Sequence, residues 1–141
     1  DNGTSKPEAV EHLVDPDWKT VHEVDRVKYF IYEPVEGSDT TKPQPYPSGP
    51  LRLEQGTSNP SNRRIVVREP TAGRVRLNLA ICKGMPFEAT ERKSKRTGKV
   101  TKFLMFFAIR EETKGRERFL FQCATTNDHD TLVAKFTEMT K

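Results

Sequence analysis

The densest group of chemically active side chains in this sequence is a run of six positive charges within eleven residues. It consists of Arg92, Lys93, Lys95, Arg96, Lys99 and Lys102. A cationic segment of this kind attracts anions, such as phosphoinositides, nucleic acids or protein carboxylates. The same composition also suits a solvated hairpin tip that keeps a β protein soluble. The run alone leaves both interpretations open.

A second basic group is spread over two neighbouring strand-like segments. It consists of Arg63, Arg64, Arg68, Arg74 and Arg76. If the two segments pair through a turn at 70–73, their outward arginines lie close enough to bind a carboxylate-rich peptide. Ordinary solvation of a strand face would give the same pattern. We therefore expect a basic patch here and treat its role as a hypothesis.

Groups that could catalyse a reaction do not converge. His12, His22 and His129 fall in separate segments, and no nucleophile elbow, phosphate-binding loop, HExxH motif or pair of metal-binding cysteines is present. We expect no enzyme, no metal site and no cofactor. Cys82 and Cys123 lie in apolar strand-like runs, which predicts two buried, reduced cysteines of an intracellular protein.

Charge is unevenly distributed along the chain. The first fifty residues carry five basic and ten acidic side chains, a net charge of −5, and the rest carry nineteen and ten, a net charge of +9. We therefore predict an acidic, flexible arm over 1–20 and one basic domain over 21–141. Because the chain begins at Asp1, we expect a piece of a longer protein. Within residues 1–141, the sequence contains neither a membrane-spanning apolar run nor a signal peptide.

The elements that position these groups are mainly strands. Alternation predicts a first strand over 21–32, and five prolines within 33–50 predict a loop that no helix or central strand could cross. Further strands are predicted at 51–53, 64–68, 74–81, 103–109 and 119–124. The fourth of these, apolar throughout, is expected to be covered on both faces.

The last segment changes to helical periodicity. Leu132, Phe136 and Met139 recur at helical spacing, and Asn127 and Asp130 have the spacing of a capping box. About six or seven antiparallel strands, curled on themselves and closed by one helix, are therefore predicted. The aromatic residues fall on core positions of these strands, which disfavours nucleic acid as a ligand.

Four segments together resemble a known family. They are G-P-L-R-L at 49–53, R-I-V-V-R at 64–68, G-R-V-R-L-N-L-A-I at 73–81 and M-P-F at 85–87. Over about 21–140 the chain resembles Ran-binding domains, most of all the divergent type found in nuclear-pore nucleoporins. The resemblance implies a pleckstrin-homology-like fold, a bent seven-stranded sandwich capped by a C-terminal helix.

The resemblance also implies a function, the non-catalytic binding of GTP-bound Ran in nucleocytoplasmic transport. Ran's acidic tail would lie on the basic face formed by Arg63, Arg64, Arg68, Arg74 and Arg76. In this family an acidic arm wraps back onto the GTPase, and the candidates here are Asp15, Asp17, Glu23 and Asp25. An importin is a possible second partner, the isolated domain is expected to be monomeric, and the expected location is the nucleus at the nuclear pore complex.

Two departures from the family pattern bear on affinity. Where typical members have W-x-E-R-G, this chain has Y-P-S-G at 46–49, and the Asn-His pair of the third strand is missing. These losses suggest weaker binding, dependence on a second binder, or a fold kept without its partner. The alternatives are phosphoinositide or nucleic-acid binding through 92–102, and a peptide-docking scaffold of the same fold.

Overall fold

The computed structural model describes residues 16–110, 112–113 and 115–141. Seven antiparallel strands form one sheet in the order β4-β3-β2-β1-β7-β6-β5, and a helix follows the last strand. The elements are β1 (Trp18–Pro34), β2 (Thr41–Gly56), β3 (Arg63–Arg68), β4 (Val75–Ala80), β5 (Phe87–Lys93), β6 (Val100–Ile109), β7 (Arg116–Cys123) and α2 (Thr126–Met139). The predicted mainly β fold with one C-terminal helix is confirmed. Within the described residues, no helix is long and apolar enough to cross a membrane.

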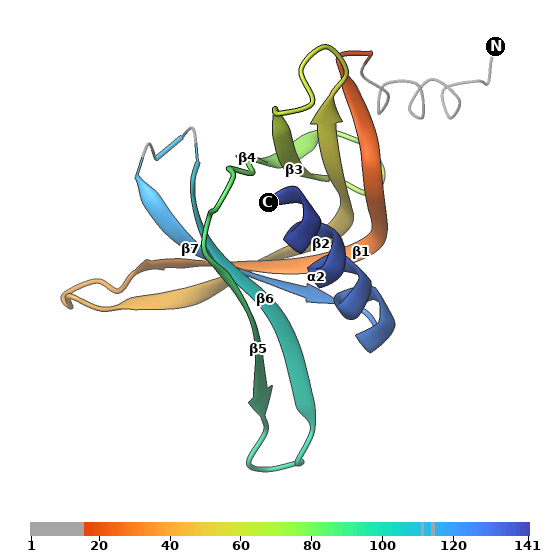
Figure 1. Ribbon diagram of the computed structural model, residues 1–141. Helices are drawn as coiled ribbons and strands as arrows, with labels where there is room; N and C mark the ends of the chain where they lie inside the picture. The colour runs from red at the N-terminus through yellow and green to blue at the C-terminus, as the bar shows by residue number, and fades with distance from the viewer. Residues whose placement is uncertain (1–15, 111, 114) are drawn as a thin grey trace.

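The two long strands β1 and β2 curl the sheet. β1 pairs with β2 along most of its length, and it pairs with β7 over Val27–Ile31. The β1–β2 register shifts at three places, between Thr20 and Tyr29. Such bulges bend a strand and increase its twist. Figure 1 shows the result, in which β1 turns from the region beside β3 and β4 toward the region beside β7.

The prediction of a loop over 33–50 is wrong, because residues 41–50 belong to β2. Only residues between Pro34 and Thr41 form a turn, closed by a hydrogen bond from the Val35 amide to the Thr40 carbonyl. Prolines 43, 45 and 47 lie inside β2, where the strand pairs with β1 alone because β3 pairs only with 51–55. Successive residues direct their N–H groups to opposite edges, so Pro43 and Pro45, at alternate positions, both lack donors on the same edge, and the other edge can still pair with β1.

The core lies between the inner face of the curled sheet and α2. The predicted stripe of Leu132, Phe136 and Met139 is buried, with Phe136 fully so. The Phe136 ring lies 5.3 Å from that of Phe106 on β6 and 5.0 Å from that of Phe87 on β5. These contacts place α2 across the mouth of the sheet (Figure 1).

The helix begins two residues earlier than the predicted capping box implies. Thr125 is the N-cap, and its hydroxyl oxygen accepts a hydrogen bond from the Asp128 amide at 3.1 Å. A side-chain acceptor three residues before a free N–H satisfies one of the unpaired donors of the first turn. The pair Asn127 and Asp130 therefore lies inside the helix, which spans 14 residues.

One strand was not predicted, and the predictions that 103–109 is covered on both faces and that both cysteines are buried are wrong. β5 was not predicted, since its sequence F-E-A-T-E-R-K lacks an apolar alternation, as befits an edge strand paired only with β6. β6 is buried on its inner face, but Met105 and Phe107 are half-buried and Ile109 is exposed.

Cys82 is exposed, because β4 ends at Ala80, whereas Cys123 is half-buried and burial raises its pKa to about 11.

Candidate functional site

The predicted basic patch lies on the outer face of β3 and β4. Ile65, Val67 and Leu77 belong to the core, so by alternation Arg64, Arg68 and the neighbouring Arg76 point to the opposite face. We call the outward residues of β1–β4 the first face. The turn at 70–73 brings β3 and β4 together as predicted, with Gly73 in a left-handed conformation (φ 72°). Three of the five predicted arginines thus share one face.

Arg64 is already neutralised within the domain. Its Nε donates to Glu54 Oε1 on β2 at 2.7 Å, and its guanidinium lies 4.0 Å from the centre of the Trp18 ring. Only 15% of the Arg64 side chain and 2% of Glu54 are exposed. A buried carboxylate needs its partner, because an isolated charge is costly to desolvate. The main role of Arg64 is therefore to stabilise the sheet, and it contributes little free positive charge to the surface.

Arg74 and Arg76 share one carboxylate at the edge of the first face. Arg74 Nε lies 3.3 Å and Arg76 Nη2 lies 3.9 Å from Glu69, and Arg76 Nη1 donates to the Pro47 carbonyl at 3.1 Å. Two positive groups against one negative group leave an excess of positive charge. Arg74 is 81% exposed, so it is the most accessible of the predicted arginines for which a contact is described, whereas Arg68 is buried.

Arg63 does not lie with the other arginines. Its Nη1 donates to the Met139 carbonyl at 2.7 Å, at the C-terminal end of α2 on the inner side of the sheet. Consecutive strand residues point to opposite faces, so Arg63 and Arg64 cannot share one. A cation at this end of a helix stabilises the exposed carbonyls. The expectation of one patch of five arginines is wrong for Arg63.

The basic run 92–102 forms a hairpin rather than a loop. Arg92 and Lys93 end β5, Lys102 belongs to β6, and Lys95, Arg96 and Lys99 occupy the turn. The turn is closed by two hydrogen bonds of 2.8 Å, which the Gly98 amide donates to the Ser94 carbonyl and the Ser94 amide donates to the Lys99 carbonyl. Residues 92 to 99 are all exposed.

The candidate acidic residues occupy different settings. Asp15 lies outside the described residues. Asp17 is exposed just before β1, while Glu23 and Asp25 lie within β1 and so belong to the sheet. Glu23 accepts from Arg52 Nε at 2.8 Å. Since β1 begins at Trp18, three residues of the predicted arm are strand residues.

A polar cluster at the far end of β6 and β7 was not predicted. Arg110 donates twice to Glu117, at 2.7 and 2.9 Å, and Tyr46 donates to Glu33 beside it. The paired guanidinium lowers the pKa of Glu117, and burial raises the pKa of Tyr29, stacked on Tyr46, to about 12. These groups keep one protonation state at neutral pH, which suits a structural role.

A second group of arginines was predicted only in part, because Arg92 belongs to the basic run 92–102 whereas Arg116 and Arg118 were not among the candidates. Arg92, Arg116 and Arg118 lie over aromatic rings of β6 and β1 on the outer face of the other half of the sheet. The spacing of Arg116 and Arg118 could have indicated part of this group, because residues two apart on a strand share one face and these two alternate with the core-facing residues of β7. The partners could not be inferred, because Tyr32 and Arg118 are far apart in the sequence and meet only when β1 pairs with β7.

Comparisons with solved structures identify the fold. The chain is similar to the Ran-binding domain of the nuclear complex component Nup2 from Ashbya gossypii, with a TM-score of 0.66 and 17% identity over 88% of this chain and 96% of that one. A second structure of the Nup2 Ran-binding domain from the same organism gives 0.60 and 16% over 82% and 92%. No family model matches the sequence, and no curated protein matches it. The chain has the fold of a Ran-binding domain, as its motifs predicted.

Proposed function

We propose that this domain binds the GTP-bound form of the small GTPase Ran, without catalysis, as part of nucleocytoplasmic transport. The observation that carries the proposal is the likeness to Nup2 Ran-binding domains, which covers nearly the whole of both chains. The motif segments at 49–53, 64–68 and 73–81 support it, because they form β2, β3 and β4 of that same fold. Their side chains build the first face.

On this proposal the first face holds an acidic segment of Ran. Arg74 and Arg76 supply the accessible charge, and Arg68 lies beside them on β3. Arginine suits this task because its planar group can form two parallel hydrogen bonds to one carboxylate. The internal pairs Arg64–Glu54 and Arg52–Glu23 hold the neighbouring strands in register. Acidic residues before β1, Asp17 among them, would face a basic part of the GTPase.

The biological setting follows from the same likeness. We propose a nucleoporin or transport cofactor at the nuclear pore complex, with an importin as a second partner and a monomeric isolated domain. Solvent-exposed charges act through electrostatic attraction that salt screens over about 10 Å at 0.1 M ionic strength. Ran binding should therefore weaken as salt is raised.

A charge-reversal pull-down tests the use of the first face. The variant R74E/R76E should recover much less Ran loaded with a GTP analogue than the unchanged domain, because four units of charge change beside the proposed contact. The matched control K93E/K95E makes the same change at the end of β5 and in the turn that follows it. It should recover nearly as much Ran as the unchanged domain. Equal losses in the two variants would remove the first face from the proposal.

Anionic lipids or nucleic acid remain the second candidate, favoured by one observation. Residues 92 to 99 project as an exposed cationic hairpin that the first face does not use. The variant K93E/K95E should then abolish sedimentation with phosphoinositide-containing vesicles. Vesicle binding that K93E/K95E removes, with no recovery of GTP-loaded Ran, would favour this candidate.

A further inference from the structure

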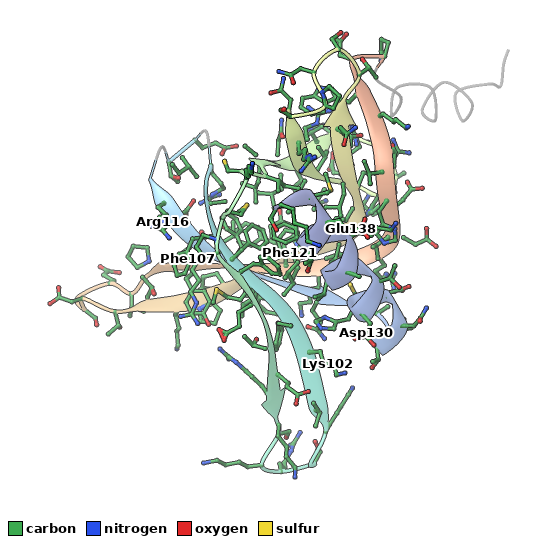
Figure 2. The ribbon with its side chains drawn as sticks, in the orientation of Figure 1. Lys102, Phe107, Arg116, Phe121, Asp130 and Glu138 are labelled. Carbon is green, nitrogen blue, oxygen red and sulfur yellow. The ribbon has the colours of Figure 1, made fainter. Side chains whose placement is uncertain are left out.

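The outer face of the other half of the sheet carries arginines interleaved with aromatic rings. Leu104, Phe106, Phe119 and Phe121 face the core, so alternate residues of β6 and β7 face outward. We call this surface the second face. The side chains that define it are Tyr32, Arg92, Phe103, Phe107, Arg116 and Arg118. Figure 2 labels Phe107 and Arg116 close together, on the side of the sheet away from the helix.

Aromatic rings hold the three guanidinium groups in place. Arg118 lies 4.4 Å from the Tyr32 ring centre, Arg116 lies 4.9 Å from that of Phe107, and Arg92 lies 5.9 Å from that of Phe103. Arg92 Nη2 also donates to the Tyr32 hydroxyl at 2.9 Å. Contact with a ring restrains each guanidinium group and leaves most of its N–H donors available. The groups are thus oriented before any ligand arrives, which lowers the entropy cost of binding.

In the described part of the chain, these three arginines have no carboxylate as a salt-bridge partner. Among the described residues, no carboxylate oxygen lies within 4.0 Å of Arg92, Arg116 or Arg118, whereas Arg64 and Arg110 are paired in that way. Arg118 Nε is buried and has no hydrogen-bond partner in the described structure. Within the described residues, the Arg118 guanidinium therefore has neither a carboxylate partner nor an acceptor at Nε that would compete with a ligand for its charge.

A hollow adjoins two of the arginines. It has a volume of about 500 Å³, and its lining includes Tyr32, Pro34, Phe107, Arg116 and Arg118. Apolar walls beside two cations suit a ligand with a large apolar group flanked by negative charge. Glu117 also lines the hollow, but Arg110 already binds both of its oxygens. The hollow therefore keeps a positive character.

We propose that the second face binds an extended acidic peptide, with its carboxylates on Arg92, Arg116 and Arg118 and one large apolar side chain in the hollow. A carboxylate can accept two parallel hydrogen bonds from one planar guanidinium group. Single-stranded nucleic acid fits less well, because its bases need free ring faces, and an arginine already occupies one face of Tyr32 and one face of Phe107. The inference does not depend on the binding of Ran.

Fluorescence anisotropy tests the inference directly. The probe is a short fluorescein-labelled peptide of aspartates and glutamates around one leucine, compared with the same peptide carrying asparagines and glutamines. The acidic peptide should bind, and R116Q/R118Q should weaken it roughly tenfold, which corresponds to about 1.4 kcal/mol. The control K93Q/K95Q removes the same charge on the neighbouring hairpin and should change the affinity less than twofold.

Three further measurements keep the test decisive. R116Q alone, at an exposed position, should weaken binding without lowering the melting temperature, so a loss cannot be ascribed to unfolding. Replacement of the peptide's leucine by serine should also weaken binding. Equal effects of the two double variants, or tighter binding of a thymidine oligonucleotide than of the acidic peptide, would overturn the proposal. A failure of the Ran pull-down would leave this result unchanged.

Discussion

At the scale of single residues, the arginines of the outward faces differ in what balances their charge. Arg64 is balanced by Glu54, of which only 2% is exposed, and the two atoms of the pair are 2.7 Å apart. Arg52 is balanced by Glu23, of which 46% is exposed. A salt bridge in water contributes little because the charges are well solvated when apart. A buried one is costly to break, because one desolvated charge is left alone.

The two glutamates allow this difference to be measured by the same substitution. We expect Glu54→Gln to lower the free energy of unfolding by about 2 kcal/mol, because Arg64 would keep its charge without a counterion. Glu23→Gln should lower it by less than about 0.5 kcal/mol. Urea denaturation of both variants gives the comparison. Losses of equal size would show that the burial of Glu54 does not matter.

His129 supplies a second prediction at this scale. It lies in the first turns of α2, is 5% exposed, and its Nδ1 has no hydrogen-bond partner in the described structure. Burial lowers its pKa below 6.5, an effect that Lys102 reinforces and that Asp130 and Glu91 oppose. The unfolded chain then binds more protons than the folded one below that pH. Stability is therefore complete above about pH 6.5 and falls as the solution is acidified.

The measurement is the free energy of unfolding at about pH 7 and about pH 5. The unchanged domain should be less stable at the lower pH, and His129→Gln should show a smaller difference between the two. His22, whose pKa burial also lowers, should account for part of what remains. A slope that His129→Gln leaves as steep as before would contradict the assignment.

At the scale of elements, the course of β2 controls how the sheet curls. Gly49 lies where β2 passes from its pairing with β1 alone to its pairing with β3 as well. A Cβ atom at this position would lie only 2.1 Å from the Arg68 carbonyl oxygen at the end of β3. Backbone cannot move aside as a flexible side chain can. The position therefore requires glycine for space, which explains the first residue of the G-P-L-R-L motif.

We expect Gly49→Ala to lower the free energy of unfolding by about 1–3 kcal/mol, as overpacking does elsewhere. Gly37, in the turn between β1 and β2, is a contrasting site because a Cβ there meets nothing within 4 Å. Its φ of 77° still disfavours alanine, by about 1 kcal/mol. Thermal melts of the two variants should place Gly49→Ala well below Gly37→Ala. The reverse order would show that β2 can shift away from β3.

The elements also show which parts of the fold the sequence could predict. Strands with an apolar alternation, such as β4 and β7, and the stripe of α2 were predicted, because burial on one face imposes a period. β5 was missed because none of its residues is buried, unlike those of β4 at the other edge of the sheet. The first half of β2 was missed because prolines at an open edge cost no hydrogen bond. The pairing of 64–68 with 75–80 followed from the turn between them.

At the scale of the whole molecule, the candidate sites depended on contacts that no local pattern contains. The prediction placed five arginines together, but strand alternation moved Arg63 to the helix C-terminus, and Glu54 engaged Arg64. The second face arises because the curl of the sheet brings β1, β5, β6 and β7 around a common surface. Arg92 on β5 and Tyr32 on β1 form a hydrogen bond there, although β6 and β7 lie between their strands. Long-range pairing of this kind can be seen only in the folded molecule.

The proposed function requires the domain to distinguish the nucleotide state of Ran, and a calorimetric titration of the domain with Ran measures this preference. Ran loaded with a GTP analogue should bind, with an affinity that falls as salt is raised, whereas Ran loaded with GDP should bind much more weakly or not at all. Indistinguishable affinities for the two nucleotide states, or no detectable binding of either at low salt, would contradict the account.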